Sequence, residues 1–278
     1  MKELFFITSF VLLCYLIYSI VINKKIKLTK YIVSSSKIPV DFNGYRIILL
    51  TDIHNESYLN NDEFVKKVEK LKPNIILLGG DMIDSRRTNI DEAISLALKF
   101  NKDTPMYFVT GNHEYRVDEN IEFIHRLQNI GIKVLRNERE YICIGDSKIL
   151  LIGIDDPHFI SQRGHHDEQI AVNKVLDELI DSKVYSVLLT HRPEFFEEFY
   201  QHGIDLALAG HTHGGQIRIP FIGGIIAPHQ GFFPKYDAGV FVKGDTTLII
   251  SKGLGRSSFP IRINNQAEIV CIDLQCKS

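Results

Sequence analysis

Several short apolar runs in this sequence each end in glycine, aspartate or histidine, and this pattern restricts the possible folds more than any other feature. Tyr45–Thr51, Asn74–Leu78 and Pro105–Thr110 have the continuous apolarity of strands buried on both faces. Segments of helical periodicity follow them, at Asn61–Leu71, Asp91–Phe100 and Glu119–Asn129. This alternation is typical of an α/β domain.

The second half of the sequence predicts a further set of strands. Short strands are expected at Lys133–Leu135, Glu140–Ile144, Lys148–Ile154, Tyr185–Thr190 and Ile204–Ala209. A helix is expected over residues 167–180, and the tail from Thr246 to Leu274 is again rich in strand-forming residues. The predicted fold is therefore α/β, with two sheets packed as a sandwich and flanked by helices.

Side chains that can bind metal ions follow five of these strands. They are Asp52, His54, Asp81, Asn112, His191, His211 and His213. Ligands of α/β sheets bind beyond the carboxyl ends of the strands, so we expect these groups to meet at one edge. Mixed imidazole and carboxylate ligands suit Mn, Fe or Zn better than Ca. Seven donors exceed the need of one ion and predict two divalent ions about 3.5–4 Å apart, bridged by a carboxylate.

The spacing of these residues resembles that of a known family. The matching blocks are Asp52-x-His54, Gly80-Asp81-x-x-Asp84, Gly111-Asn112-His113-Glu114, His191 and Gly210-His211-Thr212-His213. Together they resemble the calcineurin-like metallophosphoesterase superfamily over residues 45–274. The stretch GHTHGGQ at residues 210–216, with Gly253-Leu254-Gly255 and Pro260-Ile261-Arg262, resembles its bacterial membrane-associated phosphodiesterase subgroup.

This resemblance implies a role for each residue. Asp52, His54 and His213 would hold the first ion, Asn112, His191 and His211 would hold the second, and Asp81 would bridge them. His113 would be the catalytic residue that lies near the scissile phosphate without binding metal. Asp84 is expected to form a turn or to orient a ligand.

The expected mechanism follows from charge. Two divalent ions with the carboxylates of Asp52 and Asp81 would leave a positive pocket that attracts a phosphate ester. A water bridging the ions would have a lowered pKa and would attack as hydroxide. His113 would protonate the leaving group or hold a phosphoryl oxygen.

Other residues leave two interpretations open. His229 is expected either to line the pocket or to belong to a surface loop. Phe232, Phe233 and Tyr236 would form either an apolar lip for a lipid-like substrate or ordinary loop packing. Arg262 is expected to be solvated or ion-paired rather than to meet phosphate.

The amino-terminal segment predicts a membrane anchor. Leu4 to Ile22 carries no charge, and about 20 apolar residues cross a bilayer as a helix. A cleaved signal peptide is disfavoured because no small-residue cleavage site accompanies the apolar run. A buried core helix is disfavoured because a helix that is apolar all round would need packing partners on every side. Four lysines follow the run, at positions 24, 25, 27 and 30, and favour a cytoplasmic catalytic domain, although a signal anchor would export it.

The predicted organisation is an anchor over residues 1–23, a linker or edge strand over 24–40 and a catalytic domain over 41–278. The expected function is hydrolysis of a phosphodiester associated with the membrane or cell envelope. A phosphomonoesterase, a nuclease or a non-catalytic scaffold of the same fold are the alternatives. The net charge of −2 argues against general nucleic-acid binding, which usually requires a basic excess.

Overall fold

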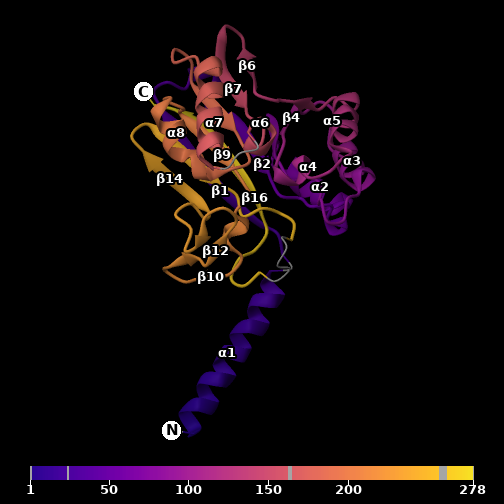
Figure 1. Ribbon diagram of the computed structural model, residues 1–278, viewed down its shortest axis with the longest axis vertical. Helices are drawn as coiled ribbons and strands as arrows, with labels where there is room; N and C mark the ends of the chain where they lie inside the picture. Colours follow the sequence, from indigo (N-terminus) through magenta and orange to yellow (C-terminus); the bar gives the residue numbers. More distant parts are fainter. Residues whose placement is uncertain (1, 24, 162–164, 257–261, 278) are drawn as a thin grey trace.

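The computed structural model describes residues 2–23, 25–161, 165–256 and 262–277, with only the backbone at some positions of α1 and at residues 165–166. Lys24, Pro260 and Ile261 lie outside the described residues. The helices are α1 (Lys2–Ile22), η1 (Val40–Phe42), η2 (Ser57–Leu59), α2 (Asp62–Glu69), α3 (Ile90–Leu98), α4 (Asn112–Tyr115), α5 (Asn120–Asn129), α6 (Pro157–Ile160), α7 (His165–Leu179), η3 (Pro193–Phe195), α8 (Phe196–Gln201) and η4 (His213–Gly215). Figure 1 shows α1 projecting from a compact body that contains the other elements.

Two six-stranded sheets form the centre of this body. The first has the order β1 (Lys27–Ser35), β16 (Glu268–Cys276), β2 (Arg46–Leu50), β3 (Ile75–Gly79), β4 (Met106–Val109) and β5 (Lys133–Val134). The second has the order β14 (Gly239–Lys243), β15 (Thr246–Ile250), β9 (Leu206–Ala209), β8 (Ser186–Leu189), β7 (Ser147–Gly153) and β6 (Glu138–Ile144). Leu49, Leu77 and Val109 of the first sheet share one buried cluster with Leu189 and Leu208 of the second. The predicted two-sheet α/β architecture is confirmed.

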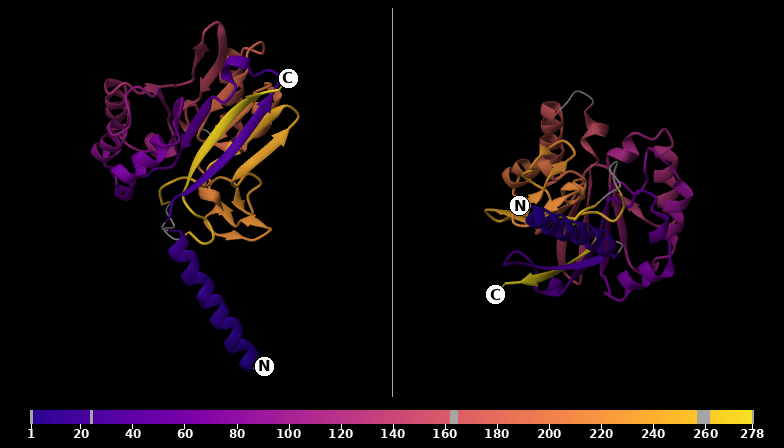
Figure 2. Two further views of the ribbon diagram at one scale, coloured as in Figure 1. Left: turned by 180° about the vertical axis from the view of Figure 1, so that it is seen from behind. Right: turned by 90° about the horizontal axis from the view of Figure 1, so that it is seen from below.

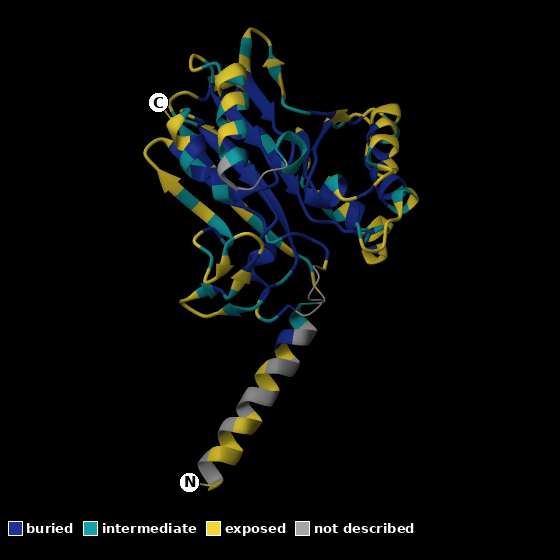
Figure 3. Cartoon of the chain, in the orientation of Figure 1, coloured by how far each residue is buried: buried dark blue, intermediate teal, exposed yellow. Residues whose placement is uncertain are grey.

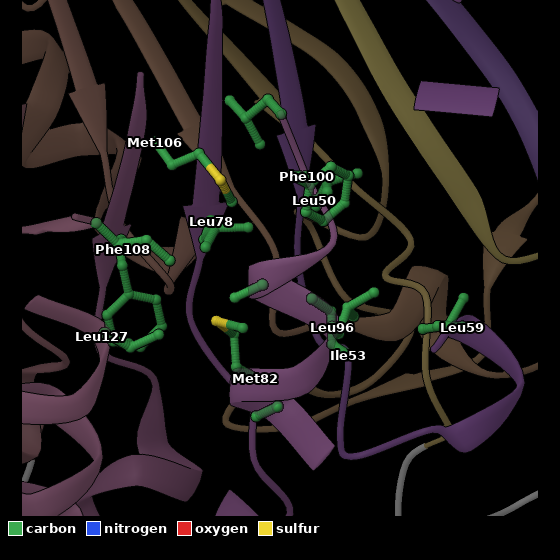
Figure 4. Close-up of a cluster of buried hydrophobic side chains, with 14 of the residues drawn as sticks. Leu50, Ile53, Leu59, Leu78, Met82, Leu96, Phe100, Met106, Phe108 and Leu127 are labelled. Carbon is green, nitrogen blue, oxygen red and sulfur yellow. The ribbon is translucent and has the colours of Figure 1, made fainter. Parts of the chain in front are cut away.

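Helices cover the outer faces of both sheets. In the first outer cluster, Leu50 and Phe108 pack under α3 and α5 (Figure 4). The ring of Phe108 meets that of Phe123 edge to face at 5.7 Å. The second outer cluster joins β7, β8 and β9 to α7 and α8, for example through Leu188 and Phe199. Figure 3 shows the resulting pattern, in which the strands are buried and the outer surfaces of the helices are exposed. Strands with an apolar layer on each side explain why the central runs are apolar throughout.

Strand direction places the metal-binding candidates relative to α1. The edge strand β1 begins five residues after α1 ends, pairs in parallel with β16, and β16 pairs antiparallel with β2. Because β2, β3 and β4 are mutually parallel, their carboxyl ends point toward the end of the sheet where α1 is attached. The loops that follow these strands therefore gather near α1.

Helix α1 extends away from the domain in Figure 1 and in the left view of Figure 2. Phe5, Phe6, Ile7 and Phe10 are exposed on it. In the part of the chain that the structure describes, no helix combines the length and apolarity needed to cross a membrane. The transmembrane helix expected from the sequence is therefore not found there.

Two small hairpins follow β9, which the sequence analysis did not predict. They consist of β10 (Arg218–Ile219) with β11 (Gly223–Gly224), and β12 (Ile226–Ala227) with β13 (Gly231–Phe232). Strands of two residues are too short to show a two-residue period in sequence. Both hairpins lie at the end of the domain from which α1 emerges (Figures 1 and 2).

Candidate metal centre

The seven candidate ligands follow β2, β3, β4, β8 and β9, and the fold brings them together in one buried cluster. Each side chain is at most 4% exposed. Three overlapping groups have ligand atoms within 4.8 Å of one another: Asp52 with His54 and His213, His54 with Asp81 and His113, and Asp81 with His191 and His211. Asp81 belongs to two of these groups, so it lies between the outer ones.

The first outer group joins the loop after β2 to the loop after β9. Nε2 of His213 lies 3.1 Å from Nε2 of His54 and 3.4 Å from Oδ1 of Asp52. The backbone N–H of His211 donates to both carboxylate oxygens of Asp52, at 3.1 and 3.2 Å. Two imidazole nitrogens and a carboxylate thus converge on one small volume.

The second outer group joins the loops after β3, β8 and β9. Oδ2 of Asp81 lies 3.2 Å from Nε2 of His191, which lies 3.1 Å from Nδ1 of His211. Nδ1 of His191 is bonded to the carbonyl oxygen of Gly79 at 2.8 Å. Since a carbonyl only accepts, that nitrogen carries the proton, and Nε2 of the neutral ring is left with a lone pair for a cation.

Asn112 supplies a direct indication that the cluster fits a metal. It lies at the start of α4, and its Oδ1 is buried without a hydrogen-bond partner among the residues that the structure describes. A buried amide oxygen without a partner is costly, and a cation would satisfy it. With two carboxylates and four imidazoles alongside, the donor set suits Mn, Fe or Zn.

The backbone at the cluster is strained. Asp52, His54, Asp81, His211 and His213 all have positive φ, between 47° and 72°. Non-glycine residues rarely adopt this conformation, and each costs on the order of 1 kcal/mol or more. Backbone hydrogen bonds hold the turns in place, such as His54 N–H to Asp81 O at 3.0 Å. Such a concentration of strained residues is typical of a functional site.

Two glycines permit the close approach of these loops. Gly80 has φ 82°, and a Cβ there would lie 2.7 Å from Nδ1 of His191. Gly253 has φ 71°, and a Cβ there would lie 2.7 Å from Cβ of Asp52. Any larger residue would push a candidate ligand out of the cluster.

Glu114 ties the loops after β3 and β4 together, a role that the sequence analysis did not assign. Its carboxylate accepts from the backbone N–H groups of Asp81 at 2.9 Å, Gly111 at 2.7 Å and Ile83 at 3.2 Å. Asp81 in turn accepts from His113 N–H at 2.8 Å. The signal in the sequence is the acidic residue at the end of the Gly111–Glu114 block.

Burial and charge set the protonation of the cluster. Burial lowers the pKa of His54 to about 3 and holds the pKa values of His211 and His213 well below their usual range. Burial also disfavours the charged form of His191, but the nearby Asp81 outweighs it and raises the pKa of His191 to about 10. Three of the four imidazoles are thus neutral, the form that binds metals.

His113 lies beside the cluster with its Nε2 4.0 Å from Oδ2 of Asp81. Its Nδ1 has three competing neighbours: the backbone N–H of Ser85 at 3.0 Å, Oγ of Ser85 at 3.1 Å and Oδ1 of Asp84 at 3.4 Å. The neutral ring can accept from Ser85, whereas the protonated ring donates to Asp84. Asp84 is itself held by Arg86, whose Nε donates to it at 2.8 Å. Oδ1 of Asp84 also accepts from the backbone N–H of Arg86 at 3.0 Å, which agrees with the turn expected for Asp84, whereas the side chain that it contacts, His113, is not one of the seven candidate ligands.

Arg262 and His229 lie against the cluster. Nη2 of Arg262 lies 3.2 Å from Nδ1 of His213 and 2.6 Å from the carbonyl oxygen of Gly255. Arg262 is 8% exposed and donates to carbonyls, so the expectation that it is solvated or ion-paired is wrong. The exposed ring of His229 stacks on that of His211, with centroids 5.3 Å apart and an interplanar angle of 28°. His229 therefore lies at the rim of the cluster.

The three aromatic residues that the sequence offered as an apolar lip or as loop packing differ in their burial. Phe232 and Phe233 are exposed, whereas Tyr236 is buried and packs edge to face on Phe196 at 5.5 Å. Tyr236 is thus a core residue, and only Phe232 and Phe233 remain candidates for an apolar lip.

Comparisons with known proteins agree with this geometry. The family model of the calcineurin-like phosphoesterases matches residues 45–215. The metallophosphoesterase YkuE of Bacillus subtilis (strain 168) is 29% identical over 256 residues, which cover 90% of this chain and 86% of YkuE. A transmembrane protein with metallophosphoesterase domain from Bos taurus is 29% identical over 253 residues, or 86% of this chain and 55% of that protein.

Among solved structures, that of TT1561 from Thermus thermophilus matches with a TM-score of 0.51 and 12% identity, over 75% of this chain and 89% of TT1561. This likeness shows the fold alone. The family match spans more than half of the 278 residues and includes all seven candidate ligands. The chain belongs to the calcineurin-like phosphoesterase family and is a metal-dependent phosphoester hydrolase.

Proposed function

We propose that this chain hydrolyses phosphodiesters with two divalent ions held in the buried cluster. The observation that carries the proposal is a chain of three buried groups of potential ligands that overlap at His54 and at Asp81. Asp52, His54 and His213 would hold one ion, and Asn112, His191 and His211 the other. Asp81, the residue between the outer groups, would bridge the two ions.

When bound, the two ions lower the pKa of a water and offset the negative charge on the phosphoryl oxygens. The carboxylates of the protein determine how much of the positive charge of the ions remains. Asp52 and Asp81 neutralise only part of it, so an anionic ester is attracted to the cluster. The bond from His191 to Gly79 fixes the ring orientation, and Glu114 fixes the loop that carries Asp81.

His113 is proposed to act on the substrate. Its Nε2 approaches the cluster from the side of Asp81, while Asp84 and Ser85 hold Nδ1. In this orientation Nε2–H can donate to the leaving oxygen or to a phosphoryl oxygen. The role requires a proton at Nε2, which both the neutral ring accepting from Ser85 and the protonated ring provide.

Two buried arginines support a diester substrate over a monoester. Arg262 donates to the carbonyl oxygens of Lys252 and Gly255. Arg192 is fully buried and bonded to Asp156 at 2.7 and 3.0 Å. Nη1 of Arg192 makes no hydrogen bond among the described residues, but it faces the carboxylates of Glu194 at 3.5 Å and Glu168 at 3.8 Å. Both guanidiniums thus face protein acceptors rather than the second negative charge of a phosphomonoester. A diester carries a single charge and needs less compensation.

We further propose that the enzyme acts at a membrane. Helix α1 exposes Phe5, Phe6 and Phe10, and exposed apolar surface of this kind is typical of membrane or protein interaction. Strand direction places the cluster at the same end of the domain as α1. The bovine relative is named as a transmembrane protein, which agrees with this proposal. The substrate would then be a phosphodiester of a lipid or of the cell envelope.

The experiment is metal analysis of the purified full chain, paired with hydrolysis of bis(p-nitrophenyl) phosphate and p-nitrophenyl phosphate in Mn²⁺. We expect about two ions per chain and faster hydrolysis of the diester. Asp81→Ala is expected to lose metal and both activities. His125→Ala, in which the exposed His125 on α5 is changed, is the matched control and should behave as wild type. Fewer than two ions, or a preference for the monoester, would contradict the proposal.

A further inference from the structure

The two hairpins carry a concentration of exposed apolar side chains. We call this the hairpin surface; its residues are Ile219, Phe221, Ile222, Ile226, Phe232 and Phe233. Phe221, Phe232 and Phe233 are each at least 64% exposed. Large apolar residues elsewhere on the described part of the domain are exposed singly or in twos, as at Ile121 and Ile170. A group of six within fifteen residues marks an interaction surface.

The hairpin surface is rigidly held. Phe221 and Phe233 have φ values of 68° and 53°, which bulky residues adopt only when their surroundings enforce it. Asp237 helps to hold this backbone conformation, because its Oδ2 accepts from Arg218 at 2.8 Å and from Gly224 N–H at 2.7 Å. The exposed aromatic rings are therefore presented by a strained, braced backbone.

Hydrogen bonds fasten the end of α1 to the same region. Ser19 of α1 accepts from Asn264 N–H at 2.8 Å, and Asn23 donates to the carbonyl oxygen of Arg262. Asn264 donates to the carbonyl oxygen of Arg218, the first residue of β10, at 3.3 Å. The helix and the hairpin surface are thus joined through one short segment, and both lie at the same end of the domain (Figures 1 and 2).

The hairpin surface also reaches the metal cluster. His229, in the β12–β13 turn, stacks on His211, and Phe232 follows three residues later. A molecule that covers the hairpin surface therefore lies next to the rim of the cluster.

We propose that the hairpin surface docks onto the lipid bilayer with which α1 associates, so that the metal cluster faces lipid-borne phosphodiesters. This inference rests on the membrane association proposed above. The positive charge next to α1 supports a lipid bilayer as the partner of the hairpin surface. The exposed Lys25 and Lys27 follow α1 directly and would attract anionic headgroups. The exposed apolar side chains of α1, a helix that is hydrogen-bonded through Ser19 to the hairpin region, support it as well.

The absence of tryptophan from the sequence gives a direct test. Phe221→Trp, Phe232→Trp and, as control, Ile121→Trp each place a single tryptophan at an exposed apolar position in the full chain. Ile121 lies on α5, away from the hairpins (Figure 1). Each variant is mixed with vesicles of phosphatidylcholine and phosphatidylglycerol that contain bromine-labelled acyl chains, which quench tryptophan in the apolar boundary.

We expect fluorescence at positions 221 and 232 to fall at least about twofold on vesicle binding, while that at 121 stays unchanged, because docked side chains reach ~5–10 Å into the boundary. Vesicle flotation of the same samples reports membrane association itself. Failure to float, or flotation without quenching at 221 and 232, overturns docking. A blue shift of tryptophan emission at positions 221 and 232 that grows with protein concentration in the absence of vesicles would overturn membrane docking. It would indicate instead that the hairpin surface binds a second copy of the chain. Hydrolysis of the soluble diester by each variant reports the proposed activity separately.

Discussion

Nε2 of His191 lies 3.2 Å from Oδ2 of Asp81, and these two residues come from neighbouring loops of different sheets. The contact joins the carboxyl end of β8 to that of β3 across the sandwich. Each of the other candidate ligands follows a strand of one sheet or of the other. The position of the cluster therefore depends on the packing of the two sheets as much as on either loop.

Loss of His191 should remove one ion of the pair. His191→Ala is expected to lower the bound metal from about two ions to about one and to reduce kcat at least ~100-fold, the loss typical of removing a group that stabilises transition-state charge. Elemental analysis and diester hydrolysis measure both effects. Two ions and near wild-type turnover in this variant would remove His191 from the ligand set.

Arg262 should support metal binding through the loop at residues 253–255, which packs against Asp52. Its Nη2 can only donate, which leaves the proton of the neutral His213 ring on Nε2, so the 3.2 Å contact to Nδ1 does not itself favour a metal ion. Arg262→Gln removes most of the bonds to the carbonyl oxygens of Gly253 and Gly255, and we expect metal affinity to fall ~10–100-fold because Asp52 loses this support. Competition with a chelator measures it, and Arg262→Lys should recover part of the affinity. Unchanged affinity in Arg262→Gln would leave Arg262 with a purely structural role.

His229 should affect substrate binding but not metal binding. It stacks on His211 from the exposed rim, so His229→Ala leaves every candidate ligand in place. We expect KM for the diester to rise about tenfold, corresponding to a loss of roughly 1.4 kcal/mol of binding, with two ions retained. Steady-state kinetics with metal analysis checks this, and a drop in metal content would instead place His229 in the support of His211.

Removal of metal should destabilise the protein. A ligand at about 100 times its Kd stabilises the folded state by ~2.7 kcal/mol, so EDTA should lower the Tm and Mn²⁺ should restore it. In Asp81→Ala the effect of EDTA should be much smaller. Thermal unfolding followed by circular dichroism measures the shift. An identical Tm of the wild type with and without EDTA would argue against metal bound at the cluster.

The buried pair of Asp156 and Arg192 should make stability depend on acid pH. Burial alone would raise the pKa of Asp156, but the bonds from His158 and Arg192 and the charge of Arg192 lower it from 3.8 to about 2. Since the folded pKa lies below the unfolded one, the ionised carboxylate stabilises the fold above pH 3.8 and this contribution is lost as the pH falls to about 2. Asp156→Asn should therefore weaken the pH dependence in this window.

The same variant should cost about 3–5 kcal/mol at neutral pH, because the buried guanidinium of Arg192 loses its nearest carboxylate and keeps only the longer contacts to Glu194 at 3.5 Å and Glu168 at 3.8 Å. Urea unfolding between pH 2 and pH 7 measures both effects. The exposed Asp118, changed to Asn, is the control. Equal urea midpoints for Asp156→Asn and the wild type at neutral pH would contradict the prediction.

The sequence predicted the central strands and their helices because burial leaves a clear record in composition. Ile47 to Leu50 and Ile75 to Leu78 are apolar throughout since each has a packed layer on both faces. It did not predict the hairpins at residues 218–232, since two-residue strands leave no periodicity, nor the burial of Tyr236 and Arg262. Segments distant in sequence contribute to the burial of both side chains, because Tyr236 packs on Phe196 and Arg262 contacts His213.

By itself, the sequence determined the two-sheet architecture and the chemical identity of the cluster, because strand-length apolar runs and the donors that follow them are local properties. Only the tertiary structure decided which donors share a volume, that Glu114 and Arg262 brace them, and that the cluster lies beside α1 and the hairpins. These relations depend on how β16 returns between β1 and β2 and on how the two sheets pack. Such contacts join residues far apart in the chain, so no local pattern encodes them.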